Sequence, residues 1–171
     1  MEMVLKSVSN SHKSFVRELF QDELVKRYVI LDDDIGEDVG DLVDIWLDEA
    51  SRNAGKAWII FAIEPASFFK PEKTAPCGYI DFKCYTQNSG RVTYALLEGF
   101  RGKGFVKTGL KSILQHLKEL GIQFVEADID RDNIASENIV EFLGFTTDKR
   151  AAVIDFDRGG KVRHLWKKSL G

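Results

Sequence analysis

The sequence is poor in the residues that mark several classes of protein. It contains two cysteines and three prolines, and two cysteines are too few for a disulfide scaffold or a four-cysteine zinc site. The longest purely apolar run is AWIIFAI at 57–63, far short of the ~20 residues that a membrane-spanning helix needs. The first residues, MEMVLKSVSN, lack the long apolar region of a signal peptide. We therefore expect a cytoplasmic protein with reduced thiols and no membrane partner.

An excess of positive charge is also missing. The chain carries 24 Lys and Arg against 27 Asp and Glu, a net charge of −3, so we expect no nucleic-acid partner. Its three histidines are scattered, and no His, Cys and carboxylate cluster has the spacing of metal ligands, so we expect no metal. With 44% hydrophobic and 30% charged residues in 171 positions, and no repeat or break in composition, the sequence predicts one globular domain over 1–171.

Acidic residues are concentrated in one short stretch. Residues 31–50 contain no Lys or Arg and nine carboxylates, at Asp32, Asp33, Asp34, Glu37, Asp38, Asp41, Asp44, Asp48 and Glu49. Such a run is usually a solvated face. Because no basic residue offsets this negative charge before Arg52, the stretch is also consistent with an acidic surface that attracts a cationic substrate.

Hydrophobic periodicity predicts the element order β-α-α-β-β-β-α-β-α-β-β. The predicted strands are 3–8, 57–64, 77–86, 91–97, 122–129 and a hairpin about 158–160, and a loop holds all three prolines at 65–76. The predicted helices start near Ser11, Asp22, Val39, Val106 and Asn133. Three consecutive strands followed by β-α-β indicate an α/β fold with a mixed, mostly antiparallel sheet flanked by helices.

A glycine-rich turn between the strand 91–97 and the strongest helix is the first chemical signal. It reads Arg101-Gly102-Lys103-Gly104-Phe105-Val106-Lys107. Free N–H groups and the dipole at a helix N-terminus favour an anion. The residues do not match a Walker A loop, because Val106 precedes Lys107-Thr108, nor a dinucleotide fingerprint, because position 107 is Lys.

The second signal is NIASENIVEFLGF at 133–145, with Asn133, Ser136, Ile139, Gly144 and Phe145 at characteristic positions. Together the two segments resemble the GNAT superfamily of N-acetyltransferases, and more closely its RimJ/RimL-like branch. The resemblance is sharp over about 91–146 and follows the strand order of the whole chain. It implies about seven strands, with the fourth and fifth splayed apart around acetyl-CoA.

The resemblance also implies where acetyl-CoA is held. The backbone N–H groups of Gly102, Lys103, Gly104, Phe105, Val106 and Lys107 would bind its diphosphate, and Arg101 and Lys103 would add positive charge. Backbone groups of Tyr94, Ala95 and Leu96 would bind the pantetheine arm as an added strand. Asn133 would bond the arm from the opposite side and also cap its helix. Val106 departs from the Gly or Ala that is usual there.

The implied reaction is direct attack of a primary amine on the thioester within a ternary complex. Many family members protonate the leaving thiolate with a tyrosine, and that position here is Val140. Ser136 is the first substitute as catalytic residue, although a first-turn serine often bonds only backbone. Tyr94 is the second, although a strand tyrosine is often core. Asp81 is a base candidate if it faces the cleft rather than water.

Other functions stay open at this stage. The acceptor would be a protein N-terminus, a polyamine, an amino sugar or an amino acid, and the acidic stretch favours a cationic one. The protein would be a monomer or homodimer. The alternatives are a non-catalytic acyl-CoA-binding or sensing domain, and a domain that has lost coenzyme A and acts as an interaction module.

Overall fold

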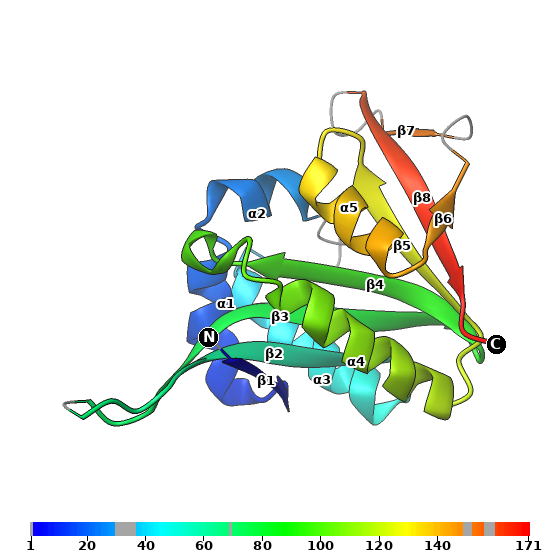
Figure 1. Cartoon of the computed structure of the whole chain (residues 1–171). Helices are drawn as coiled ribbons and strands as arrows, with labels where there is room; N and C mark the ends of the chain where they lie inside the picture. Colours follow the sequence, from blue (N-terminus) through cyan, green and yellow to red (C-terminus); the bar gives the residue numbers. More distant parts are fainter. Residues whose placement is uncertain (1, 30–36, 69, 149–151, 156–159) are drawn as a thin grey trace.

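The computed structural model describes residues 2–29, 37–68, 70–148, 152–155 and 160–171 (Figure 1). Within them, eight strands form one sheet in the order β1-β2-β3-β4-β5-β8-β6, and β7 pairs with β8. The strands are β1 Glu2–Ser7, β2 Gly55–Glu64, β3 Lys73–Thr86, β4 Ser89–Leu96, β5 Phe124–Asp130, β6 Thr146–Thr147, β7 Val153–Asp155 and β8 Lys161–Ser169. Of the strand pairs formed by these described residues, β4–β5 alone is parallel, which confirms the predicted mixed, mostly antiparallel sheet.

Helices cover both faces of the sheet. They are α1 Lys13–Leu19, α2 Glu23–Tyr28, α3 Leu42–Ser51, α4 Phe105–Glu119 and α5 Ile134–Phe142. Short 3-10 turns precede α1, α3 and α4 at Asn10–His12, Val39–Asp41 and Glu98–Phe100. Figure 1 shows α4 on one face of β1–β4 and α1 and α3 on the other. All five predicted helices are therefore present.

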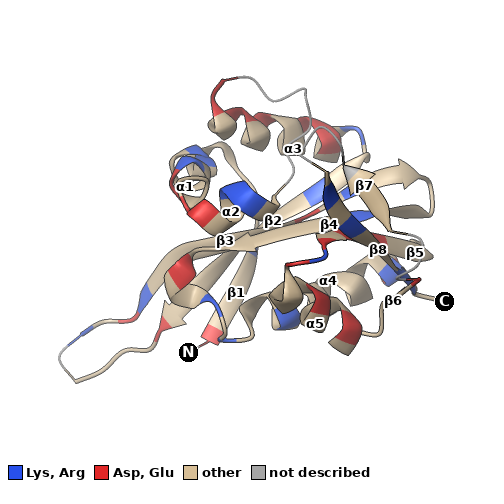
Figure 2. Ribbon diagram, turned by 90° about the horizontal axis from the view of Figure 1, so that it is seen from above, with Lys and Arg blue, Asp and Glu red and all other residues tan. Residues whose placement is uncertain are grey.

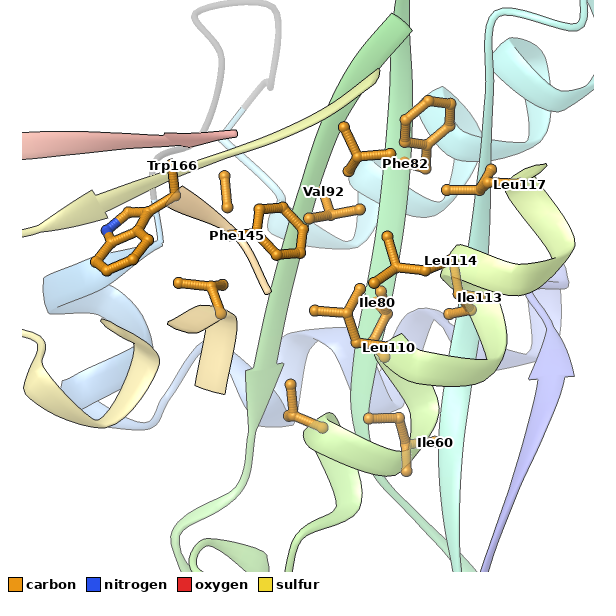
Figure 3. Close-up of a cluster of buried hydrophobic side chains, with 14 of the residues drawn as sticks. Ile60, Ile80, Phe82, Val92, Leu110, Ile113, Leu114, Leu117, Phe145 and Trp166 are labelled. Atoms are coloured by element: carbon orange, nitrogen blue, oxygen red, sulfur yellow. The ribbon is translucent and has the colours of Figure 1, made fainter. Parts of the chain in front are cut away.

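Each face of the sheet has its own apolar core. The spacing of Leu110, Ile113, Leu114 and Leu117 places them on one side of α4, where they are at most 5% exposed and pack against strands β2–β4 (Figure 3). A second cluster joins α1 and α3 to the opposite face, with Trp46 tilted over Tyr79 at 4.8 Å between ring centroids. The sheet therefore lies between two apolar cores.

The sheet splits in the middle. β4 and β5 pair only at their first residues, from Ser89 opposite Phe124 to Arg91 opposite Glu126. Beyond that point β5 keeps its pairing with β8, as far as Asp130 opposite Arg163. The two strands therefore diverge, which confirms the splay expected between strands 4 and 5 (Figure 1).

The structure corrects two details of the sequence-based prediction. The proline-containing segment 65–76 is not entirely loop, because β3 begins at Lys73; Pro76 is tolerated where the register shifts between Ile60 and Phe61, and proline in sheets is largely confined to bulges and edges. The C-terminal tail supplies β6, β7 and β8 rather than a simple hairpin, so the sheet has eight strands instead of about seven. Arg158 and Gly159, at the predicted hairpin turn, lie outside the described residues.

No helix in the described ranges is long and apolar enough to cross a membrane.

Candidate active site

The open edge of β4 is the first component of the site. Leu97 N–H donates to the Cys77 carbonyl at 2.9 Å, so Leu97 and Cys77 bond across the β3–β4 pair. Hydrogen-bonded pairs alternate in an antiparallel ladder, so Ala95 directs its backbone groups toward Tyr79 of β3, while Tyr94 and Leu96 direct theirs into the V. Of the three residues expected to hold pantetheine through their backbones, Tyr94 and Leu96 thus have the suitable orientation.

The turn after β4 is shaped for close approach of an anion. Gly102 and Gly104 have φ values of 73° and 78°, a left-handed conformation that side chains other than glycine disfavour. Thr108 N–H donates to the Gly104 carbonyl at 2.9 Å, so the amides of 105–107 precede the repeating bonds of α4. Val106 is 5% exposed and part of the core beneath α4. Its side chain therefore packs inward, and its backbone N–H is unaffected by the departure from Gly or Ala.

The two cationic side chains of the turn have local partners. Arg101 donates to the Leu96 carbonyl at 3.0 and 3.2 Å and to the Asp22 carboxylate. Lys103 donates to the Gly99 carbonyl at 2.6 Å. Both charges still lie at the mouth of the turn, but Arg101 also holds α2 against the end of β4.

Helix α2 spans the open side of the V and is anchored on both arms. At its N-terminus the cap is Asp22. Partial burial alone would raise the pKa of Asp22, but the hydrogen bond from Arg101 and the N–H groups of Val25 and Leu24 lower the pKa overall. At its C-terminus Arg27 pairs with Asp132, and Lys161 of β8 donates to the Arg27 carbonyl at 2.9 Å.

A cavity of about 460 Å³ lies between β4, α2 and α5. Every residue that the sequence assigned to coenzyme A lines it except Lys103, which is at the exposed rim. The lining from the predicted set is Tyr94, Ala95, Leu96, Arg101, Gly102, Gly104, Phe105, Val106, Lys107 and Asn133. The other nine residues come from the single segment 94–107. Asn133 follows the end of β5, and it lines the same cavity because β5 runs parallel to β4 and forms the other arm of the V.

A second cavity, of about 530 Å³, lies on the other side of the V against α3, β3 and β5. The two cavities share five residues: Tyr28, Val29, Tyr94, Asn133 and Ser136. This junction is where a group bound in one cavity can meet a group bound in the other. Two of the three predicted catalytic residues, Ser136 and Tyr94, are at this point.

Ser136 and Tyr94 contact each other across the V. The Tyr94 hydroxyl donates to the Ser136 carbonyl at 3.4 Å, and burial raises the pKa of Tyr94 to about 12, against a smaller lowering from that bond. The Ser136 hydroxyl has no hydrogen-bond partner among the described residues, while its backbone N–H donates to the Asn133 side chain. Ser136 therefore has a hydroxyl proton to donate, whereas the Tyr94 proton is directed at a backbone carbonyl.

Asp81 lines the second cavity, so it faces the cleft, as its candidacy as a base requires. Its negative charge, together with burial as the larger cause, raises the pKa of Tyr79 well above the usual value. Val140 is fully buried in the core and lines neither cavity. Val140, at the position where the resemblance implies an acid, is therefore part of the apolar core.

The acidic stretch is more balanced than its sequence suggests. Among its carboxylates that the structure describes, from Glu37 to Glu49, four form ion pairs, three of them with residues outside 31–52. The pairs are Asp38 with Arg17, Asp44 with Lys13, Asp48 with Arg52 and Glu49 with Lys83. The Arg17 hydrogen bonds, with the Gly40 N–H, lower the pKa of Asp38 to about 2. The expectation of an unbalanced run is therefore wrong for these four, and Asp32, Asp33 and Asp34 lie outside the described residues.

Tyr28 and Val29 were not found by sequence reasoning. They lie at the end of α2 and line both cavities. No motif marks them, because they reach the junction only through the anchoring of α2 on both arms of the V. Tyr28 lies between two cations, Arg27 at 5.1 Å and Lys161 at 5.8 Å from its ring centroid.

Asn133 allows its two expected roles to be separated. Its side chain accepts the Ser136 N–H at 3.2 Å, so Asn133→Ala should lower the free energy of unfolding by about 1 kcal/mol, the usual value of an N-cap. Asn133→Asp keeps the cap but lacks the amide donor, so it should restore stability in urea unfolding without restoring acetyl-CoA affinity in calorimetry. If the aspartate variant binds as well as the native chain, Asn133 is a cap and nothing more.

The sequence also matches a family model. Residues 2–146 fit the model described as an acetyltransferase (GNAT) domain. The chain belongs to the GNAT acetyltransferase family. This confirms the resemblance and the predicted class of enzyme, an N-acetyltransferase. No curated protein sequence matches the chain significantly.

Solved structures share the fold of this GNAT domain at low sequence identity. RimL, a ribosomal-protein alpha-N-acetyltransferase in complex with coenzyme A, is 18% identical with a TM-score of 0.77, over 98% of this chain and 93% of that one. A spermidine N-acetyltransferase from Vibrio cholerae, in complex with coenzyme A and spermine, is 13% identical with a TM-score of 0.74, over 98% of this chain and 95% of that one. The putative acetyltransferase yncA from Salmonella typhimurium, with acetyl-CoA, is 15% identical with a TM-score of 0.76, over 99% of this chain and 94% of that one.

Proposed function

We propose that this GNAT domain transfers the acetyl group of acetyl-CoA to a primary amine by direct attack in a ternary complex. The observation that carries the proposal is the meeting of two cavities at Tyr94, Asn133 and Ser136. A donor bound along β4 and an acceptor bound against α3 would meet there with no covalent enzyme intermediate. The coenzyme A complexes of structural neighbours with the same fold support the assignment of the first cavity to acetyl-CoA.

The residues present fit acetyl-CoA along the whole of the first cavity. The amides of Gly102 to Lys107 suit a diphosphate, because two left-handed glycines bring the backbone to the surface and α4 adds its positive dipole end. The inward backbone groups of Tyr94 and the N–H of Leu96 suit the amide groups of pantetheine, whereas the Leu96 carbonyl already accepts from Arg101. When bound, acetyl-CoA supplies the acetyl group as a thioester.

The chemistry that remains falls to the side chains at the junction. The Ser136 hydroxyl is the donor for the leaving sulfur, and Tyr94 keeps the first turn of α5 in place through the Ser136 carbonyl. An alkyl ammonium has a pKa near ~10 and must lose a proton before it attacks. Asp81, facing the acceptor cavity, is the proposed base or the origin of a water chain to one.

An amine panel tests the proposal directly. The protein is mixed with acetyl-CoA and each of a protein N-terminal peptide, polyamines, amino sugars and amino acids, and release of free thiol is measured. We expect at least one amine to release thiol above the hydrolytic background, with one acetyl group gained by the amine in mass spectrometry. Acetyl-CoA binding without thiol release from any amine would instead favour a sensing domain, and absence of binding an interaction module.

A further inference from the structure

The acceptor cavity has an ordered charge pattern along β3 and β4. In the antiparallel register Asp81 lies opposite Thr93, and the next pair on the same face is Lys83 opposite Arg91. All four line the cavity. The first pair is one residue from Tyr94 at the junction, and the second is about 7 Å further out, at ~3.3 Å for each residue of strand. An acid is thus near the reaction point and two cations are beyond it.

Two cations directly opposite each other weaken a sheet unless an anion lies between them. Lys83 Nζ is 3.6 Å from the Glu49 carboxylate, and Arg91 Nη1 is 3.7 Å from the Asp128 carboxylate, which Arg163 approaches at 2.5 Å. Figure 2 shows acidic positions along α3 and basic positions on the strands beneath it. The cavity therefore has cations among its acids: Asp48, Glu49, Asp81, Asp128 and Asp130 line it together with Arg52, Lys83 and Arg91.

The Arg91 guanidinium has donors to spare. Its side chain is 37% exposed, and its guanidinium makes no hydrogen bond in the part of the chain that the structure describes: Nη1 is 3.7 Å from the Asp128 carboxylate, and the buried Nε faces away from solvent. Its plane lies over the Tyr85 ring, 5.2 Å from the centroid, which orients it without using its donors. An arginine presents five N–H donors in a fork that matches a carboxylate, so this side chain is well arranged to receive an anionic group of a substrate.

We infer that the acceptor is an amine that carries a carboxylate several bonds away, with its ammonium at Asp81 and its carboxylate between Arg91 and Lys83. This inference rests on the proposed acetyl transfer, because it assigns the acceptor of that same site. The separation of about 7 Å along the strands excludes a simple α-amino acid, whose two charged groups are adjacent. It fits an ω-amino acid or a short peptide.

Matched amines test the assignment. The value of kcat/KM is measured for 5-aminopentanoate and for glycylglycine, each against its uncharged amide, in the native chain and in Arg91→Gln. In the native chain kcat/KM should be at least ~10-fold higher for each carboxylate than for its amide. Arg91→Gln should bring this carboxylate-to-amide ratio close to one, with little change in kcat/KM for the amides. Which of the two carboxylates reacts faster distinguishes an ω-amino acid from a peptide.

Two further variants separate charge from geometry. Arg91→Lys keeps the charge but not the fork, so it should recover part of the preference. Lys111→Gln removes a cation from the exposed side of α4, where it lines neither cavity, and should leave the ratio unchanged. The inference is overturned if the native chain has a carboxylate-to-amide ratio of kcat/KM near or below one, or if Lys111→Gln lowers that ratio as much as Arg91→Gln does. Either result leaves the proposed acetyl transfer intact.

If only other amines of the panel are acetylated, the inference is overturned and acetyl transfer stands. If neither the matched amines nor any amine of the panel is acetylated, the proposed transfer fails and binding decides the inference. Glycylglycine is then titrated into the complex with coenzyme A by calorimetry. Binding that is at least ~10-fold weaker in Arg91→Gln supports the carboxylate site, and absence of binding or equal affinity overturns it.

Discussion

Gly104→Glu should weaken acetyl-CoA binding on the order of 100-fold. The glutamate would place a negative charge within about 5 Å of a bound diphosphate, and two like charges at that distance repel by roughly 3 kcal/mol at an effective dielectric constant of 20. The left-handed φ of 78° adds backbone strain for any residue with a side chain, although the space around a Cβ there is open. Isothermal calorimetry with acetyl-CoA measures the loss.

Two controls isolate the charge at the diphosphate. Gly104→Ala carries the strain without the charge and should bind much better than Gly104→Glu. Gly121 has a φ of 86° and an open surrounding at the opposite end of α4, about 22 Å away at 1.5 Å for each of its 15 residues. Gly121→Glu thus repeats strain and charge far from the site and should bind normally. Full affinity in a folded Gly104→Glu protein would refute the assignment of coenzyme A to this turn.

Ser136→Ala should lower kcat by about 100-fold and leave acetyl-CoA affinity nearly unchanged. A positioned proton donor is worth about 10²–10⁴ in rate, and the hydroxyl of Ser136 is at the junction of the two cavities with no partner among the described residues. Its backbone N–H and carbonyl, which hold Asn133 and Tyr94, remain in the alanine variant. Steady-state kinetics and calorimetry on the same preparation check the two parts.

Ser112→Ala is the matched control for this variant. Ser112 is exposed on α4, where its hydroxyl donates to the Thr108 carbonyl at 3.3 Å, and its loss should leave kcat unaffected. If kcat of Ser136→Ala stays within a factor of about two, the hydroxyl does not donate the proton. Tyr94→Phe and Tyr28→Phe then become the decisive variants, because both phenols line the same junction.

Local sequence determined the elements and the cofactor side of the site. The apolar spacing from Leu110 to Leu117 specifies one buried face of α4, and Gly102 and Gly104 specify a left-handed turn before it, whatever the rest of the chain does. The residues of the first cavity from Tyr94 to Lys107 all come from one short segment of the chain. A short motif can therefore identify them, and the motif with Asn133 and Ser136 supplies the facing wall.

Only the tertiary structure decided the acceptor side, because its residues come from elements that no local pattern brings together. Tyr28 reaches the junction through the anchoring of α2 by Arg101 and Lys161. Lys83 and Arg91 become neighbours only in the register of β3 with β4. The acids of 31–50 that looked unbalanced are paired in part by Lys13, Arg17 and Lys83, which are distant in sequence. Charge balance and cavity polarity depend on distances in space, and sequence spacing does not specify those distances.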